Sequence, residues 1–338
     1  MPAFKENYGL KKYNTFGIDA KAKYFVSFDS IIELKNILQS EIYSSNKTLI
    51  LGGGSNILLT KDFDGLILHN KITGICILED NEEFVIVDVG AGVNWHDFVL
   101  WSVSQELSGL ENLALIPGTV GAGPVQNIGA YGMEVKDTIT KVHAFEIAKS
   151  TIKIFSNEEC KFEYRNSIFK VALKDKIIIT KVEFKLLKIP LNKTTYGAIQ
   201  DELKALNLKP SPRHIAEAVI NIRNRKLPNP TELGNSGSFF KNPVIATNKF
   251  EALKKDFPEI VGYKISELET KLAAGWLIEN AGLKGYRDGD AGVHKNQALV
   301  LVNYGNASVT DIYNLAKKIQ KTILEKYSVH IEPEVNIL

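Results

Sequence analysis

The sequence predicts a protein of two or three domains that mix α-helices with β-strands. Its 338 residues exceed the usual size of a single domain. Apolar residues make up 44% of the chain and charged residues 24%, which is typical of a globular protein with a sizeable core. Strand-like and helix-like patterns alternate, glycine-rich stretches separate them, and no internal repeat or low-complexity segment is visible.

Local patterns place the elements. Short apolar runs predict strands at Tyr24–Phe28, Thr48–Leu51, Phe84–Val89, Thr138–Phe145, Thr151–Phe155, Ile177–Leu186, Ala298–Val302 and Val329–Leu338. Helical periodicity predicts helices over residues 31–39, 95–105, 212–225, 271–281 and 308–327. Ser30 with Glu33, and Ser308 with Asp311, have the spacing of a capping box, which marks where two of these helices begin.

Composition excludes several classes of protein. Lysine and arginine number 41 against 39 acidic residues, and this net charge of +2 argues against nucleic acid as the main partner. Two distant cysteines and six scattered histidines form neither a disulfide framework nor a metal-ligand pattern. No signal peptide and no apolar run of about 20 residues is found, so we expect a cytoplasmic protein without a membrane partner.

The first glycine stretch, Gly52–Asn56, follows a predicted strand. It lacks the Gly-Lys-Ser/Thr end of a Walker A loop, and Ile57 stands where a Rossmann fingerprint needs its third glycine. Consecutive unobstructed backbone N–H groups still suit an anion. A simple glycine turn between two strands is the alternative.

The second glycine stretch, residues 116–132, is too rich in glycine and proline for regular structure. It is nearly uncharged and partly apolar, so a solvated linker is not expected. The backbone groups of a buried loop need hydrogen-bond partners, and a bound polar ligand would supply them. A heterocycle edge or a pyrophosphate fits better than a metal ion, because the stretch holds no carboxylate side chain.

The stretch Gly234–Pro243 isolates one hydroxyl, Ser238, between a glycine and two phenylalanines. Glycine and small polar residues predict a tight turn, which the two rings would anchor in a core. Such a turn presents a fixed, partly desolvated O–H group that suits proton delivery. An ordinary turn held by two buried rings is the alternative.

Three charged positions are candidates for ligand binding. Arg165 follows Tyr164, whose ring would hold the guanidinium fork ready for a carboxylate, unless the arginine serves only to stack there or to pair with Glu163. A basic run, Arg223–Lys226, ends a predicted helix and suits either the helix dipole or a phosphate. Glu334 lies in an apolar terminal segment, which is unusual for an acid unless that strand is an exposed edge.

Seven short motifs form an ordered set that spans nearly the whole chain. They are Asn14–Gly17, Leu51–Asn56, Ile116–Ala122, Tyr164–Ser167, Gly237–Pro243, Ala274–Ile278 and Glu332–Val335. A single glycine run is weak evidence, whereas the ordered set is specific. It resembles the UDP-N-acetylenolpyruvoylglucosamine reductase (MurB) family of flavoenzymes.

The resemblance implies an α+β, three-domain flavoprotein, with an FAD-binding fold of the vanillyl-alcohol-oxidase/PCMH type and an α/β substrate-binding domain. The absence of the Rossmann and Walker A motifs agrees with this fold, because the fold holds the pyrophosphate of FAD in other glycine loops. The expected boundaries are residues 1–70 and 71–226 for two FAD-binding subdomains, 227–327 for the substrate-binding domain and 328–338 for a C-terminal strand that carries Glu334. Tyr196 and Gly197 resemble the type I members, which keep a substrate-covering loop.

Carried over position by position, the resemblance implies three catalytic residues, Arg165, Ser238 and Glu334. It implies FAD contacts at Gly52, Gly53, Gly54, Ser55, Asn56, Pro117, Gly118, Thr119, Gly121, Ala122, Gln126, Asn127, Gly129 and Ala130. It implies substrate contacts at Tyr164, Tyr196, Lys226, Asn242, Lys284 and Gln297. It implies no metal site.

The implied reaction uses FAD and NADPH to reduce UDP-N-acetylglucosamine enolpyruvate to UDP-N-acetylmuramate, a step of peptidoglycan synthesis. Arg165 and a protonated Glu334 would stabilise charge at the substrate carboxylate, and Ser238 would protonate the adjacent carbon. The expected partner is this small molecule, and the expected protein is a monomer.

Two functions of other classes stay open. A flavin oxidase of the same superfamily would use oxygen and would need no serine–glutamate pair. A nucleotide-sugar-binding protein that has lost its flavin would be colourless when purified. The visible spectrum, followed by bleaching with NADPH, distinguishes all three.

Overall fold

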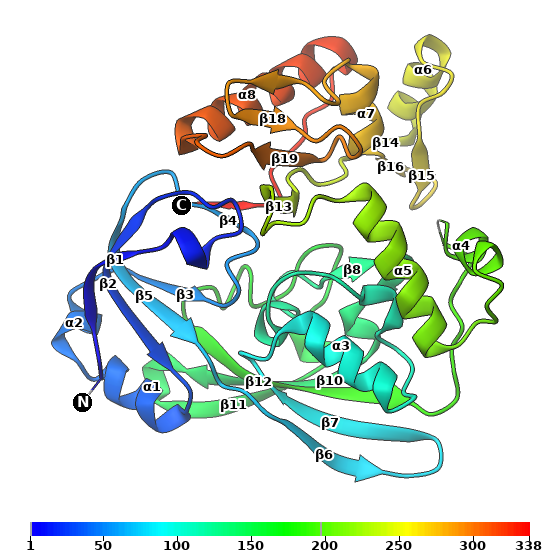
Figure 1. Ribbon diagram of the computed structural model, residues 1–338. Helices are drawn as coiled ribbons and strands as arrows, with labels where there is room; N and C mark the ends of the chain where they lie inside the picture. Colours follow the sequence, from blue (N-terminus) through cyan, green and yellow to red (C-terminus); the bar gives the residue numbers. More distant parts are fainter. Residues whose placement is uncertain (1, 197) are drawn as a thin grey trace. The chain divides into compact units, whose positions relative to one another are not determined.

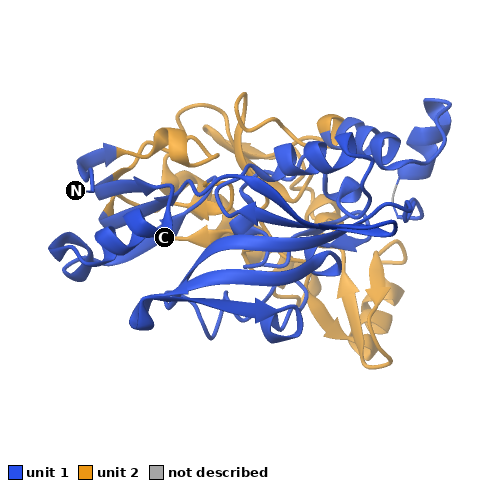
Figure 2. Cartoon of the chain, turned by 90° about the horizontal axis from the view of Figure 1, so that it is seen from below, with its two compact units in different colours: residues 1–8, 22–53, 64–223 blue, residues 9–21, 54–63, 224–338 orange. Residues whose placement is uncertain are grey.

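The computed structural model describes residues 2–196 and 198–338 (Figure 1). Contacts divide the chain into two compact units, each assembled from three separate segments (Figure 2, blue and orange). Unit 1 comprises Met1–Tyr8, Ala22–Gly53 and Asp64–Arg223, and unit 2 comprises Gly9–Lys21, Gly54–Phe63 and Asn224–Leu338. The three-domain boundaries expected from the sequence remain a proposal.

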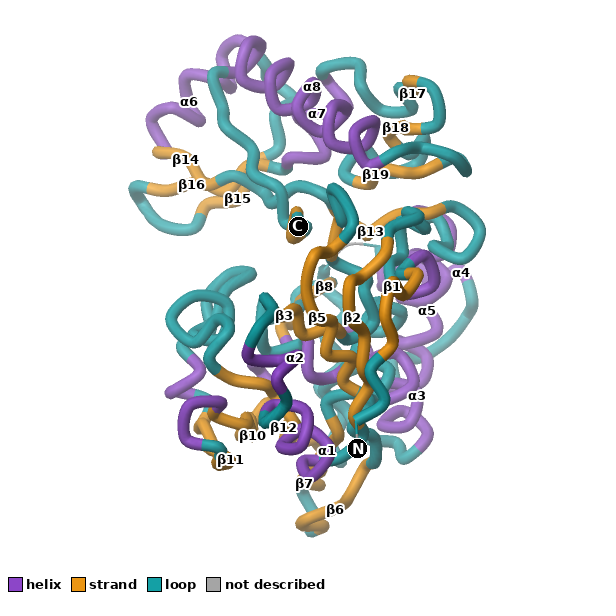
Figure 3. Tube along the Cα trace, turned by 90° about the vertical axis from the view of Figure 1, so that its left-hand side faces the viewer, coloured by secondary structure: helices purple, strands orange, loops and turns teal. Residues whose placement is uncertain are grey.

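Unit 1 begins with a four-stranded sheet in the order β1-β2-β5-β3, whose strands run side by side in Figure 3. Its strands are β1 (Lys5–Gly9), β2 (Lys21–Phe28), β3 (Thr48–Leu51) and β5 (Phe63–Asn70). The helices α1 (Ile31–Leu38) and α2 (Glu41–Ser44) connect β2 to β3, which runs parallel to β5. The Ser30 side chain accepts the Glu33 N–H and caps α1, as the sequence predicts.

A five-stranded antiparallel sheet, in the order β11-β10-β12-β7-β6, forms the rest of the framework of unit 1. Its strands are β6 (Ile75–Asp80), β7 (Phe84–Gly90), β10 (Ile139–Glu146), β11 (Thr151–Ser156) and β12 (Ile177–Leu187). The main core packs α3 (Trp95–Ser104) and α5 (Pro212–Lys226) with this sheet through Phe98, Phe184 and Val219. The short elements α4 (Ile199–Ala205), β8 (Gly129–Ala130) and β9 (Met133–Glu134) complete the unit.

Unit 2 contains two antiparallel sheets and a parallel pair. The order β13-β19-β18-β17 joins β13 (Gly234–Ser238), β19 (Val300–Asn303), β18 (Ala291–Val293) and β17 (Arg287–Asp288). The order β14-β16-β15 joins β14 (Val244–Ala246), β16 (Glu269–Leu272) and β15 (Gly262–Lys264). The parallel pair is β4 (Ile57–Leu58) with β20 (Asn336–Ile337), and the helices are α6 (Thr247–Asp256), α7 (Ala274–Asn280) and α8 (Val309–Tyr327).

Short 3-10 helices occupy several connections, at Lys11–Tyr13, Glu111–Leu113, Val120–Ala122, Val135–Asp137, Ile147–Lys149 and Glu158–Cys160. The long helix α8 packs on β18 and β19 through the apolar face that its periodicity predicts. The Ser308–Asp311 capping box at its start is confirmed.

Two predicted elements are wrong in their extent. The helix expected over residues 271–281 begins only at Ala274, because Lys271 and Leu272 belong to β16 and pair with β14 and β15. The strand expected over Val329–Leu338 is reduced to β20 and to an isolated bridge between Pro333 and Phe240. Proline has no N–H for a continuous ladder, which limits the pairing there.

Residues 2–196 and 198–338 hold no helix with both the length and the apolar character of a membrane span. Within the same residues, no group of three histidine, cysteine, aspartate or glutamate side chains is arranged to hold a metal ion.

Asn14 organises the N-terminal segment of unit 2. Its buried amide donates to the carbonyls of Leu10 (2.9 Å) and Ile18 (3.0 Å) and accepts the Ile18 N–H (2.9 Å). The next residues then serve the β13-β19 sheet, because Thr15 accepts the N–H of Asn235 and Phe16 accepts the side chain of Asn303.

We predict that Asn14→Ala lowers the free energy of unfolding by about 3 kcal/mol, because it removes three buried hydrogen bonds and leaves their backbone partners unsatisfied. Urea unfolding of the matched variants measures the loss. Asn306→Ala, at an exposed position of the same unit, is the control and should change stability by less than about 0.5 kcal/mol. Equal stability of the two variants would contradict the structural role of the Asn14 side chain.

Candidate active site

Ser238 ends strand β13 beside a break in the pairing with β19. The register shifts between Asn235 and Ser238, and Gly237 adopts a φ of +70° that disfavours other residues. The Asn235 side chain accepts the Gly237 N–H (2.9 Å) and holds this bulge. The predicted tight turn is therefore wrong: the hydroxyl is presented by a bulged strand, and Ser238 is exposed.

The predicted aromatic anchors are confirmed. Phe239 and Phe240 are buried, with exposed fractions of 0% and 1%, and their rings meet edge to face at 5.1 Å between centroids. They fix the backbone that follows Ser238.

Glu334 lies beside the same backbone. Its N–H donates to the carbonyl of Phe239 (2.7 Å), and the Lys241 N–H donates to the carbonyl of Glu332 (2.9 Å). The structure thus brings the segment that carries Glu334 next to the segment that carries Ser238, within unit 2.

The end of the first glycine loop meets Glu334 from another direction. The Asn56 amide donates to the Glu334 carbonyl (3.4 Å), and the Asn56 carbonyl accepts both the backbone N–H (3.1 Å) and the side chain (3.0 Å) of Asn336. Within this loop Gly54 has a φ of +63°, and a Cβ there would lie 1.9 Å from the carbonyl oxygen of Tyr13. Only glycine fits that position.

The two glycine loops touch each other within unit 1. A Cβ on Gly53 would lie 3.0 Å from the Cα of Gly118, and a Cβ on Gly52 would lie 2.4 Å from the Thr119 hydroxyl oxygen. At Gly53 and Gly118 the loops therefore approach through bare backbone. A cradle of backbone that side chains would fill fits the pyrophosphate of a dinucleotide such as FAD.

In the second glycine loop, the protein itself satisfies more of the backbone hydrogen-bonding groups than the sequence predicts. The Val120 N–H donates to Val93 (2.9 Å), the Gly121 N–H donates to Ala91 (2.9 Å), and the Gly118 carbonyl accepts the Trp95 N–H (3.1 Å). The neighbouring protein backbone thus satisfies several groups that a ligand was expected to satisfy. These bonds fix the shape of the loop in advance.

Arg165 belongs to unit 1, where its guanidinium donates to the carbonyls of Gly129 (2.7 Å) and Asn127 (3.4 Å). The group lies 5.6 Å from the centre of the Tyr164 ring. Arg165 has a φ of +55°, and such a backbone conformation in a residue other than glycine is often found at functional sites. The arginine fork is therefore tied to the end of the second glycine loop.

Among the other predicted FAD contacts, Asn127 is fully buried. Its amide donates to Glu134 (3.0 Å) and to the carbonyl of Glu163 (3.0 Å), and its side-chain oxygen accepts the Lys136 N–H (3.2 Å). The Asn127 side chain thus supports the loop.

Two predicted substrate residues converge on the start of α7. The Asn242 side chain accepts the Ala274 N–H (3.0 Å), and a Cβ on Gly275 would lie 3.6 Å from the Gln297 side-chain oxygen. Lys284 pairs with Glu279 (2.7 Å), and Lys226 is the last residue of α5. These four residues belong to unit 2.

The predicted cover segment lies in unit 1. A Cβ on Gly132 would lie 3.2 Å from the Cβ of Tyr196, so Tyr196 covers the end of the second glycine loop. Gly197 lies outside the described residues.

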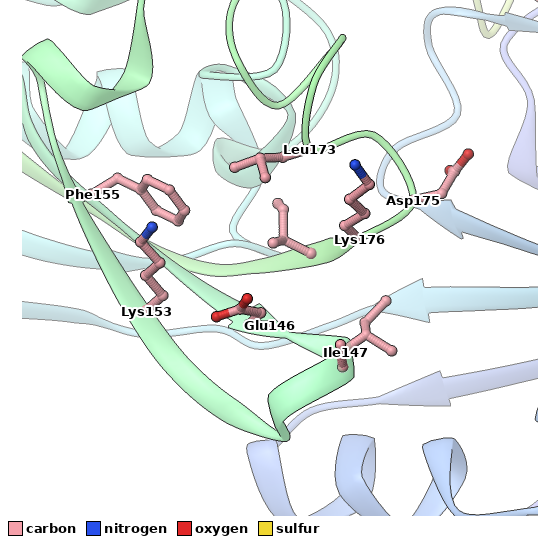
Figure 4. A pocket seen from close by; sticks show the side chains of 9 residues that line it. Glu146, Ile147, Lys153, Phe155, Leu173, Asp175 and Lys176 are labelled. Carbon is pink, nitrogen blue, oxygen red and sulfur yellow. The ribbon is translucent and has the colours of Figure 1, made fainter.

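Unit 1 also contains a pocket of about 280 Å³ (Figure 4). Phe155 and Leu173 contribute apolar walls, and Glu146, Lys153 and Lys176 surround them. Its lining contains no residue of the candidate site.

Comparison with known proteins identifies the family of the chain. The UDP-N-acetylenolpyruvoylglucosamine reductase C-terminal domain family matches residues 229–338, and the FAD binding domain family matches residues 22–156. The reductase of Flavobacterium johnsoniae is 53% identical over 337 residues, and that of Chromobacterium violaceum is 46% identical over 337 residues. Each alignment covers 99% of both chains.

Solved structures support the fold. MurB from Thermus caldophilus superposes with a TM-score of 0.68 at 24% identity, covering 100% of this chain and 98% of that one. The 6-hydroxy-D-nicotine oxidase of Arthrobacter nicotinovorans reaches a TM-score of 0.52 at 13% identity, covering 92% and 82%. The predicted α+β flavoprotein fold is confirmed. The chain belongs to the UDP-N-acetylenolpyruvoylglucosamine reductase family and is an FAD-dependent oxidoreductase.

Proposed function

We propose that this enzyme uses NADPH to reduce UDP-N-acetylglucosamine enolpyruvate to UDP-N-acetylmuramate for peptidoglycan synthesis. It acts as a cytoplasmic monomer on this small molecule, without nucleic-acid or membrane partners. The backbone pairing of Glu334 with Phe239, next to Ser238, is the observation that carries the proposal. This pairing places the proposed proton donor, Ser238, and the proposed acid, Glu334, on neighbouring backbone segments.

The glycine loops would hold FAD, which with NADPH as the reductant would supply the hydride that the vinyl carbon of the substrate accepts. Negative charge then develops on the substrate carboxylate and on the carbon next to it. Arg165 binds the carboxylate with a guanidinium that Gly129 and Asn127 already hold in place. Preorganised donors of this kind stabilise charge without reorganisation during the reaction.

Glu334 acts in its protonated form, because a second negative charge beside the carboxylate would oppose the reaction. Ser238 donates its proton to the carbon. A free hydroxyl is a weak acid, but an enolate-like carbon is a strongly basic acceptor. The exposed end of β13 lets the hydroxyl reach a bound substrate.

The remaining predicted contacts complete the proposal. Lys226 and Lys284 bind the diphosphate as point charges, and Asn242, Gln297, Tyr164 and Tyr196 contact the sugar or the uridine. The glycine loops hold the FAD pyrophosphate. Two FAD-binding subdomains, residues 1–70 and 71–226, then precede a substrate-binding domain.

The first test is Ser238→Ala under anaerobic conditions. NADPH should still bleach the flavin, whereas reoxidation by the enolpyruvyl sugar should slow by about 10²–10⁴-fold, because only that step needs the proton. Stopped-flow absorbance measures both half-reactions. Ser236→Ala is the control, since that hydroxyl is buried two residues away, and its rates should match those of the unmodified enzyme. Unchanged reoxidation in the Ser238 variant would exclude the proposed role.

The second test compares Glu334→Gln with Glu334→Ala. A neutral amide still donates a hydrogen bond, so the Gln variant should keep several-fold more activity than the Ala variant, which should lose about 10²–10³-fold in kcat. Steady-state kinetics measure the ratio. Equal losses would contradict a role in which Glu334 acts as a neutral hydrogen-bond donor.

The third test addresses the contact between the glycine loops. Gly53→Ala adds a Cβ that forces Gly118 back by a few tenths of an ångström, so we expect FAD affinity to fall by about tenfold. Fluorescence titration of the apoprotein with FAD measures this. Gly9→Ala is the matched control, because its Cβ would meet nothing within 4 Å. Normal FAD binding by the Gly53 variant would contradict the proposal that the two glycine loops form the FAD site.

A further inference from the structure

The segment that carries Arg165 is a tight turn of unit 1. Backbone hydrogen bonds in both directions join Glu163 and Asn166, from N–H to carbonyl, at 3.1 Å and 3.2 Å. Tyr164 and Arg165 occupy the two corner positions between them, and Arg165 has a φ of +55°. A positive φ at the second corner of a turn usually belongs to glycine or asparagine. The conformation is therefore unfavourable for an arginine unless other contacts hold it.

The turn is docked onto the second glycine loop by side-chain hydrogen bonds. The Ser167 hydroxyl, which is buried, donates to the carbonyl of Val125 (2.7 Å). The Arg165 guanidinium donates to the carbonyl of Gly129 (2.7 Å). These two bonds place the turn and orient the end of the arginine side chain, but they do not act on the backbone of Arg165.

Lys170 acts on that backbone. Its half-buried side chain donates from the ammonium to the Arg165 carbonyl (3.0 Å). The lysine is itself anchored, because its N–H donates to the Ser167 carbonyl (3.2 Å) and the preceding Phe169 is buried against Phe155. Rotation of Arg165 into an ordinary backbone conformation would turn its carbonyl away from the ammonium. This charge-assisted bond therefore favours the left-handed conformation of Arg165.

We propose that Lys170 is a positioning residue for the reduction, which fixes Arg165 so that the guanidinium meets the substrate carboxylate in a single orientation. The inference rests on the proposed function, in which that carboxylate gains negative charge during hydride transfer. A donor that is already oriented stabilises such charge without first having to reorganise. In this role Lys170 acts only through Arg165 and needs no contact of its own with the substrate.

The test measures both half-reactions in Lys170→Met, Lys170→Arg and the control Lys176→Met. Lys176 is a matched control, because its ammonium also donates to a backbone carbonyl, that of Ala172, at 3.0 Å. In Lys170→Met, reoxidation by the enolpyruvyl sugar should slow by about 10–100-fold, because the guanidinium is no longer held in place. Reduction by NADPH should keep its rate. Lys170→Arg should recover most of the loss, and the control should match the unmodified enzyme.

A double-mutant cycle separates positioning from direct contact. Arg165→Met leaves no guanidinium to position, so adding Lys170→Met to it should slow reoxidation by no more than about twofold. A larger loss in that background would overturn the inference, because Lys170 would then act independently of Arg165. Urea unfolding of the single variants adds a readout without substrate. A Lys170→Met variant that does not fold, or that reoxidises at the unmodified rate, would also overturn the inference.

The outcomes also separate this inference from the proposed function. If the unmodified enzyme does not reduce the enolpyruvyl sugar, or if Arg165→Met alone leaves reoxidation unchanged, the proposed function fails. If Arg165→Met slows reoxidation and Lys170→Met does not, only the role of Lys170 fails.

Discussion

One backbone hydrogen bond, from the Glu334 N–H to the Phe239 carbonyl, underlies the arrangement of the candidate site. Neither residue lies in a long regular element. The buried ring pair of Phe239 and Phe240 fixes one side of this bond, and Asn56 holds the carbonyl of Glu334 on the other. Ser238 and Glu334 are therefore positioned by segments from three distant parts of the chain, and a disturbance of any one of these segments reaches both residues.

A second constraint is the contact of the two glycine loops through bare backbone. Because Gly53 and Gly118 meet without side chains, the loops lie closer than other residues would allow. Hydrogen bonds that the loop donates to the carbonyls of Val93 and Ala91 hold the second loop in shape before any ligand arrives. A preformed cradle loses little conformational entropy on binding, which favours tight retention of a cofactor.

Local signals in the sequence predict much of this. Ser30 and Ser308 mark helix starts, and the burial of Phe239 and Phe240 follows from their apolar character. What depends on distant pairing was not predictable from local patterns. The bulge before Ser238 needs strand β19, and the bonds of Asn56 need the C-terminal segment. Lys170 follows the Tyr164–Ser167 motif without a local sign of its role, and only the fold brings its ammonium to the Arg165 carbonyl.

The pairing of β20 with β4 has a consequence for how the protein is made in the cell. Strand β4 is synthesised long before its partner Asn336–Ile337. Contacts between such distant residues form slowly, because a long loop must close first. Many helices and strands can thus form before the segment that carries Glu334 is synthesised, and the candidate site is assembled only after that segment has docked.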